Sequence, residues 1–299
     1  MESFKLIYEN DLEEIIEGIK DLREFCKSNK IDIGISERIN KNTHFIKITF
    51  PEERLSKKNF NIFNLYIANI LYKALVKEFL DKYIEEFISE TYFFLNGNET
   101  EEIKQSSSEV FNIDMTLIDQ SNIYYMNRKN DILDKIIECI EENKEINIKG
   151  FLTFRMKDLK NYLQNIVDKV VEEYLIEKEY NEFIKLLKYF VEIQESKIEE
   201  VNIIISESGE YIVKDKEGND IIEQLFSEFS GGNFTGVVNM EDMLISGLIT
   251  YCPNKIVIHC ASNCLNKEFI NTIKNVFLNR VVFCDNCKTC SKIKEKTHS

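Results

Sequence analysis

Apolar residues recur in steps of three and four along residues 130–200, and no proline interrupts them. This spacing places them on one face of an α-helix, so it predicts a series of amphipathic helices. The whole chain has only two prolines, which permits long uninterrupted helices. A helical pattern already begins near residue 58, and we therefore predict a helical body over residues 58–200.

The segments on either side of this body follow other patterns. Residues 1–57 contain short alternating stretches and one helical stretch, and Pro51 closes the last of them. This pattern predicts a small mixed α/β unit. After residue 200, strand-like runs alternate with helical runs, so residues 201–299 are predicted to form an α/β module. We therefore expect an α+β fold that is predominantly helical and has three parts.

The helical body contains two groups of aromatic residues that we expect in its core. Phe151 and Phe154 stand at the start of one helix, where Arg155 is expected to pair with a neighbouring acid. Further along, apolar residues spaced i, i+4 and i+7 predict a buried stripe on one helix face. That stripe consists of Phe183, Leu187 and Phe190.

Charge and hydropathy argue against two classes of partner. The formal net charge of −14 repels phosphate backbones at long range, so nucleic-acid binding is not expected. The longest charge-free apolar run is residues 60–72, which is shorter than the ~20 residues that a membrane-spanning helix needs. The first residues do not read as a secretory signal, so we expect a cytoplasmic protein whose eight cysteines stay reduced.

The C-terminal segment gathers three of these cysteines in the pattern Cys284-x-x-Cys287-x-x-Cys290. In a reducing compartment, such thiols favour packing, metal binding or redox chemistry over a disulfide framework. Zn²⁺ prefers four Cys or His ligands in a tetrahedron. Bacterial ferredoxin-type iron–sulfur sites share the spacing, but their fourth Cys and following Pro do not occur here. The pattern therefore favours zinc over an iron–sulfur cluster.

A metal at this cluster would need a fourth ligand from elsewhere in the chain. The candidates are His259, Cys260 and Cys264, in and after the predicted strand KIVIHC. If this strand pairs in parallel with RVVFC, the carboxyl ends of both strands meet, and His259 comes close to Cys284. Two other interpretations stay open, namely a thiol–disulfide switch and a reduced cluster without a function.

The middle of the chain resembles the YtxC-like family of sporulation proteins. The resemblance rests on GF at residues 150–151, FR at residues 154–155 and EKEYNEFIKLLKYFVEIQ at residues 177–194. The later stretches NKIVIH and FINTIKNVFLNRVVFC are similar in pattern, so the resemblance covers roughly residues 60–290. It implies an intracellular protein of a spore-forming Gram-positive bacterium, and it implies no activity and no site residues.

Two function classes follow from these observations. The first is a non-enzymatic, sporulation-associated protein that acts through contacts with a protein partner and carries a structural metal at its C-terminal cluster. The second is a thiol-based redox enzyme, or a metal- or iron–sulfur-dependent enzyme, that uses the same cysteines. We favour the first, because the chain has no phosphate-binding loop, no H-E-x-x-H and no nucleophile elbow, and only three histidines.

Overall fold

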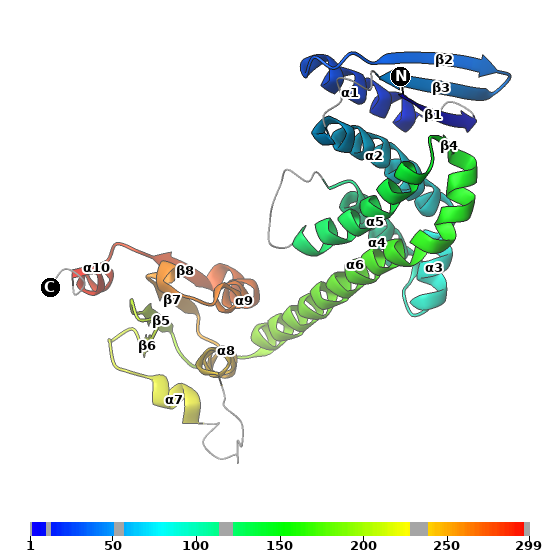
Figure 1. Cartoon of the computed structure of the whole chain (residues 1–299). Helices are drawn as coiled ribbons and strands as arrows, with labels where there is room; N and C mark the ends of the chain where they lie inside the picture. Colours follow the sequence, from blue (N-terminus) through cyan, green and yellow to red (C-terminus); the bar gives the residue numbers. More distant parts are fainter. Residues whose placement is uncertain (1, 10–12, 51–56, 114–121, 228–238, 296–299) are drawn as a thin grey trace. The chain divides into compact units, whose positions relative to one another are not determined.

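The computed structural model describes residues 2–9, 13–50, 57–113, 122–227 and 239–295. Contacts between residues group the chain into two compact units, Met1–Leu175 and Ile176–Ser299 (Figure 1). The fold is α+β and predominantly helical, which confirms the predicted fold class. The division into parts at residues 57 and 200 stays a prediction. Each unit is described by itself below.

The first unit begins with a sheet whose strand order is β2-β3-β1-β4. The first three strands are antiparallel neighbours, and α1 connects β1 to β2, in agreement with the short alternating stretches and the one helical stretch of this segment. The fourth strand pairs in parallel with β1 and was not predicted, because it has three residues within the segment expected to be helical. The elements are β1 (Glu2–Glu9), α1 (Glu13–Ser28), β2 (Gly34–Asn40), β3 (Thr43–Phe50) and β4 (Glu145–Asn147).

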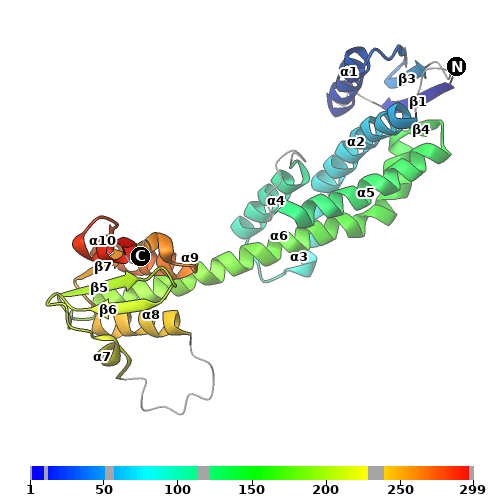
Figure 2. The same cartoon turned by 60° about the vertical axis from the view of Figure 1, so that its left-hand side comes forward.

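Helices form the rest of the first unit, and α2, α5 and α6 run alongside one another (Figure 2). They bury one continuous apolar core beneath the sheet. Partly buried polar contacts tie the helices together, since the Tyr125 hydroxyl donates to Glu173 at 2.6 Å and the Tyr92 hydroxyl donates to Asp168 at 2.6 Å. The helices are α2 (Lys57–Lys82), α3 (Ile84–Thr91), α4 (Gly97–Phe111), α5 (Ile123–Glu142) and α6 (Ile148–Ile193).

Two predictions about the aromatic residues of α6 are wrong in part. Phe151 is buried, but Phe154 is 78% exposed. The buried face of this part of α6 is formed by Met156, Leu159 and Leu163, so Phe151 lies at its edge and Phe154 points away from it. Arg155 does pair with Asp158, at 3.7 Å, as expected. In the second group Leu187 is buried as predicted, whereas Phe183 and Phe190 are exposed.

The buried stripe in that part of α6 consists instead of Ile184, Leu187 and Val191, which belong to the core of the second unit. It shares Leu187 with the predicted stripe, but Ile184 and Val191 take the places that were predicted for Phe183 and Phe190. The sequence carries two apolar stripes on this turn of helix, and periodicity alone does not choose which of them faces the core.

The second unit contains a sheet with strand order β6-β5-β7-β8. β5, β7 and β8 are parallel, whereas β6 forms an antiparallel hairpin with β5. Its strands are β5 (Glu200–Ile205), β6 (Tyr211–Lys214), β7 (Lys255–His259) and β8 (Val281–Cys284). Its helices are α7 (Ile222–Phe226), α8 (Met240–Tyr251), η4 (Ala261–Asn263), α9 (Lys267–Phe277), η5 (Leu278–Arg280) and α10 (Lys288–Glu295).

The two faces of this sheet differ in what they carry. Successive residues of a strand point to opposite faces. One face joins the main core of the unit through Val201, Ile203, Ile256 and Ile258, together with side chains from α6, α8 and α9. The opposite face carries Asn202, Ile204, Val257, His259 and Cys284, which the parallel registers bring together. The main core does not include this second face, although Ile204 and Val257 are buried on it.

Across the described part of the chain, none of the helices is both long enough and apolar enough to cross a bilayer. This agrees with the absence of a spanning helix expected from the sequence.

Candidate metal centre

The parallel pairing of β7 with β8 creates the candidate site. The register places His259 directly beside Cys284, at the carboxyl ends of both strands. Helix α9 makes the crossover between these strands, and its N-terminus is capped by Asn266, whose side chain accepts from two backbone N–H groups. The expected meeting of His259 and Cys284 is therefore confirmed. Parallel strands put their carboxyl ends at one edge of the sheet, where ligands commonly bind.

The other two thiols come from the segment that follows β8. Cys287 stands directly before α10, and Cys290 lies in the first turn of this helix. The turn between β8 and α10 brings both thiols back toward the strand ends. The Cys290 thiol donates to the Cys284 backbone oxygen there, at 3.2 Å. Cys290 is fully buried, whereas Cys284 and Cys287 are partly exposed.

The ligand atoms of His259, Cys284, Cys287 and Cys290 all lie within 4.8 Å of one another. The Cys287 and Cys290 sulfurs are 3.6 Å apart, and the Cys290 and Cys284 sulfurs are 4.0 Å apart. His259 Nδ1 lies 3.4 Å from the Cys287 sulfur and 3.5 Å from the Cys290 sulfur. Zn–S bonds of about 2.3 Å and Zn–N bonds of about 2.0–2.1 Å give tetrahedron edges of about 3.8 Å between sulfurs and about 3.5 Å between sulfur and nitrogen. The four distances fit such a tetrahedron.

The thiols affect one another's protonation. Burial raises the pKa of Cys287, but hydrogen bonds from the Cys290 backbone and side chain outweigh it and lower that pKa to about 6. Burial raises the pKa of Cys290 to about 12, and its hydrogen bond to the Cys287 sulfur adds to this effect. At neutral pH Cys287 is therefore mainly a thiolate, whereas Cys290 stays a thiol in the absence of a metal. A cation bound between these sulfurs would favour the thiolate form of each of them.

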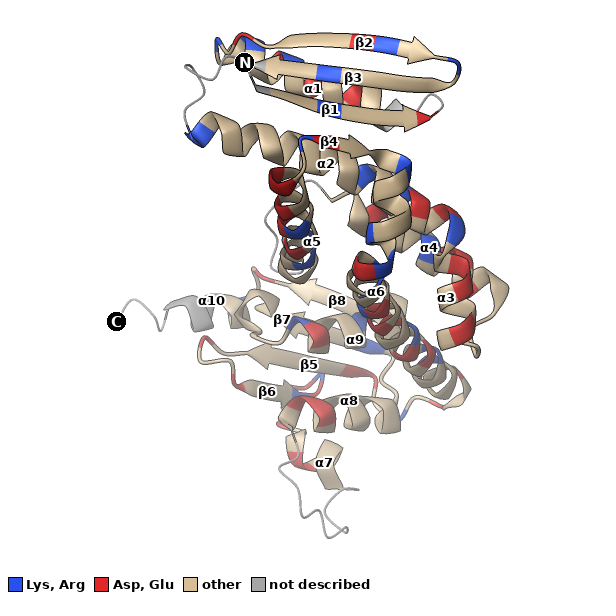
Figure 3. Cartoon of the chain, turned by 45° about the vertical axis from the view of Figure 1, so that its right-hand side comes forward, with Lys and Arg blue, Asp and Glu red and all other residues tan. Residues whose placement is uncertain are grey.

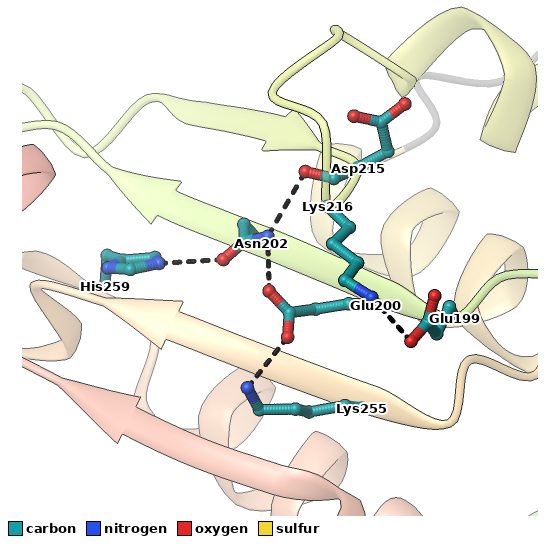
Figure 4. A network of polar contacts seen from close by, with 7 residues as sticks. All are labelled: Glu199, Glu200, Asn202, Asp215, Lys216, Lys255 and His259. Carbon is teal, nitrogen blue, oxygen red and sulfur yellow. Dashed lines mark hydrogen bonds and ion pairs between the residues drawn. The ribbon is translucent and has the colours of Figure 1, made fainter.

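The imidazole of His259 is held in one orientation by Asn202 on β5 (Figure 4). Asn202 Nδ2 donates to Glu200 Oε1 at 3.1 Å and to the Asp215 backbone oxygen at 3.3 Å. These two acceptors fix the amide, so its Oδ1 faces His259 Nε2 at 3.1 Å and accepts from the N–H there. The other ring nitrogen, Nδ1, then carries the lone pair and points at the sulfurs. This is the arrangement that supports metal-binding histidines.

Charged residues continue this network along the sheet. Lys255 Nζ lies 2.7 Å from Glu200 Oε2, and Lys216 Nζ lies 2.7 Å from Glu199 Oε1 (Figure 4). The hydrogen bond from Lys255 is the main cause that lowers the pKa of Glu200, and the contact with Asn202 contributes as well. Glu200 therefore stays ionised and keeps accepting from Asn202 at neutral pH.

The structure separates the three candidates for the fourth ligand. His259 joins the three cysteines. Cys260 is buried beside them and forms a hydrogen bond to Cys290, but it is not part of the four-atom group. Cys264 lies elsewhere, with its sulfur 3.3 Å from the Tyr211 hydroxyl and donating to the Asn266 backbone oxygen at 3.1 Å.

Sequence reasoning did not find Asn202. The residue lies on a strand far from the cysteine cluster along the chain, and an isolated Asn in a strand gives no chemical signal. A usable signal was present in its position, because Asn202 is the only polar side chain within the run VNIII. Strand residues alternate between faces, so a polar residue there had to lie on the face away from the main core.

These observations define a class of protein. It is a predominantly helical α+β protein whose C-terminal sheet gathers three cysteines and one histidine at the ends of two parallel strands. The chain belongs to the YtxC-like family, which matches it over residues 65–282 and confirms the resemblance. The match includes His259 and ends on β8 just before Cys284, so it does not extend to the three cysteines.

The chain is also similar to the "Uncharacterized protein YtxC" of Bacillus subtilis (strain 168). The two are 25% identical over 225 residues, which cover 72% of this chain and 76% of that protein. No solved structure matches the chain.

Proposed function

We propose that a zinc ion bound by His259, Cys284, Cys287 and Cys290 holds the C-terminal segment against the second face of the sheet. The protein itself would be a non-enzymatic, cytoplasmic, sporulation-associated protein that acts through contacts with other proteins. One observation carries the metal part of this proposal, namely the four ligand atoms within 4.8 Å of one another. The sporulation role rests on the family resemblance.

The composition of the site favours a structural ion over a catalytic one. Structural zinc sites use four protein ligands, whereas catalytic sites keep one position open for water or substrate. Here four ligands are present, and His259 and Cys290 are buried. No other cluster of three or more His, Cys, Asp or Glu side chains suited to a metal occurs within the described residues.

A structural ion has a clear physical task at this position. α10 has only eight residues, and isolated helices shorter than ~12 residues are marginal in water. β8 is a four-residue edge strand. The binding free energy of structural zinc in small peptides is about 10–16 kcal/mol, which is ample to hold such a segment in place.

A redox or iron–sulfur enzyme is the second candidate, and one observation favours it. The Cys287 and Cys290 sulfurs are 3.6 Å apart, and the pKa of Cys287 is lowered to about 6. A thiolate at neutral pH beside a second thiol is the arrangement of many thiol–disulfide enzymes.

Metal analysis of protein purified without oxygen tests the proposal. We expect one zinc per chain, no visible absorbance, and a lower melting temperature after chelation. The Cys290→Ser variant should lose the metal, and Cys264→Ser, the matched control outside the site, should keep it. Visible absorbance from thiolate-bound iron would support the second candidate. Metal-free protein with three readily alkylated thiols and unchanged melting on chelation would reject the proposal.

A further inference from the structure

A second apolar stripe of α6, on the side of the helix away from the core of the second unit, is open to solvent. The six side chains are each 40–60% exposed, although all are large and apolar or aromatic. Their neighbours Ile184, Leu187 and Val191 already fill the core of the unit. We name this surface the α6 stripe, and it consists of Ile176, Phe183, Leu186, Tyr189, Phe190 and Ile193.

The area of the α6 stripe lies at the upper end of what a monomer surface exposes. Fully covered aromatic side chains bury about 150–250 Å² each, so six half-exposed large side chains present on the order of 600 Å². The largest apolar patch of a typical monomer is about 300–600 Å² and is often functional. Standard interfaces bury about 800 Å² per partner. The stripe alone therefore supplies most of the area that a specific dimer needs on each partner, and the stems of its charged neighbours add to it.

The spacing of the stripe indicates that a helix covers it. Ile176, Phe183 and Phe190 are seven residues apart, and so are Leu186 and Ile193. A seven-residue apolar repeat on a helix packs best against a second helix with the same repeat. Charged residues of both signs flank the stripe along α6, as on the outer positions of paired helices (Figure 3).

We propose that the α6 stripes of two copies of this chain pack against each other in antiparallel orientation. The two-fold axis crosses the stripe at the level of residues 184–185, so Phe183 of one copy faces Leu186 of the other. By the same symmetry, each Ile176 faces the Ile193 of the second copy. The stripe is therefore self-complementary, as a two-fold interface requires. This proposal rests on the role in protein contacts proposed above, and it names a second copy of this chain as the partner. It does not depend on the metal site.

The antiparallel orientation follows from Glu179, which interrupts the stripe between Ile176 and Phe183. In a parallel pair, the two Glu179 carboxylates would face each other within the interface, which costs free energy for two desolvated like charges. In the antiparallel pair, each Glu179 faces Phe190 of the other copy near the end of the contact. Its carboxylate can reach water there while its stem covers the ring.

The test uses the mass of the full chain in solution, by light scattering from about 1 to 100 µM, since interfaces of this size range from micromolar to picomolar affinity. We expect the mass of two chains at high concentration. The double variant Phe183→Glu/Leu186→Glu should give the mass of one chain. Phe154→Glu, the matched control, changes an exposed aromatic of the same helix outside the stripe and should leave the dimer intact.

Charge pairs test the orientation. Ile176→Lys/Ile193→Glu should still dimerise, because each Lys would face a Glu of the second copy, whereas Ile176→Lys/Ile193→Lys should be a monomer. Monomeric wild type at all concentrations, dimeric Phe183→Glu/Leu186→Glu, or two monomeric charge variants would overturn the proposal. Metal content is measured in parallel. A monomeric protein with one zinc per chain would overturn the dimer and leave the metal proposal standing, and a dimeric protein without zinc would do the opposite.

Discussion

Replacing Asn202 by Ala removes the group that orients His259, without touching any candidate ligand. Asn202 Oδ1 lies 3.1 Å from His259 Nε2, and His259 is only 7% exposed. Water therefore replaces the lost acceptor poorly, and the buried N–H is left without its partner. The ring also loses the contact that keeps Nδ1 within 3.4–3.5 Å of two sulfurs.

The expected loss of zinc affinity can be estimated from residues that orient metal-binding histidines in other proteins. Mutating a group that orients a metal-binding histidine typically weakens metal affinity about 10–100-fold. A change of that size corresponds to about 1.4–2.7 kcal/mol of binding free energy. We expect a zinc dissociation constant raised within this range, with the stoichiometry still one ion per chain, because all four ligands remain.

A competition titration against a chromophoric chelator measures this dissociation constant. Asn263→Ala is the matched control, because the Asn263 side chain donates to the Ile205 backbone oxygen at 3.2 Å close to the same strands but does not contact His259. The control should bind zinc as the wild type does. Equal zinc affinity in Asn202→Ala and wild type would refute the orienting role. An equal loss in both variants would show a general loosening of the unit instead.

Three further predictions concern stability and the choice of ligand. Leu187→Ala should lower the free energy of unfolding by about 2–5 kcal/mol, because Leu187 is buried. Phe190→Ala should lower it by less than half of that in dilute, monomeric protein, because Phe190 is exposed. Equal losses in denaturant titrations would contradict the observed orientation of the helix. Lys255→Met should cost about 0.2–1 kcal/mol at pH 7 because its pair with Glu200 is partly exposed. The pKa of Glu200 is lowered on folding, so this loss of stability is fully present above the unfolded pKa near 4.5 and should vanish as the pH falls through the pKa of the folded state. A loss of stability that persists in acid would show that packing, and not charge, is responsible. Cys264→Ser protein should keep one zinc per chain in elemental analysis, and loss of metal would mean that Cys264 had supplied a ligand.

The sequence predicted those features that depend on strong local patterns and general rules of topology. The apolar runs KIVIHC and RVVFC predict two strands, and parallel pairing then brings His259 to Cys284. The choice of His259 over Cys260 was left open, because it depends on which face of β7 carries the cluster. That face is set by the register of three strands, which no local pattern contains.

Other features depend on tertiary contacts and left no usable trace in the sequence. β4 exists because β1 offers it a parallel partner, and its three residues are too few to show an alternating pattern. Similarly, two apolar stripes of α6 between residues 183 and 191 compete for the core, and tertiary packing decides which of them is buried. Ile184 faces the core, and Phe183 faces outward, although their sequence patterns are alike.

X-ray absorption at the zinc edge, on the full chain purified without oxygen, tests the central claim most directly. The account predicts three sulfur neighbours at about 2.3 Å and one nitrogen neighbour at about 2.0–2.1 Å. The nitrogen signal should show the outer-shell pattern of an imidazole and should change in His259→Ala protein. Four sulfur neighbours would mean that Cys260 replaces His259. A shell of oxygen and nitrogen alone, or protein that carries no zinc, would contradict the proposed centre.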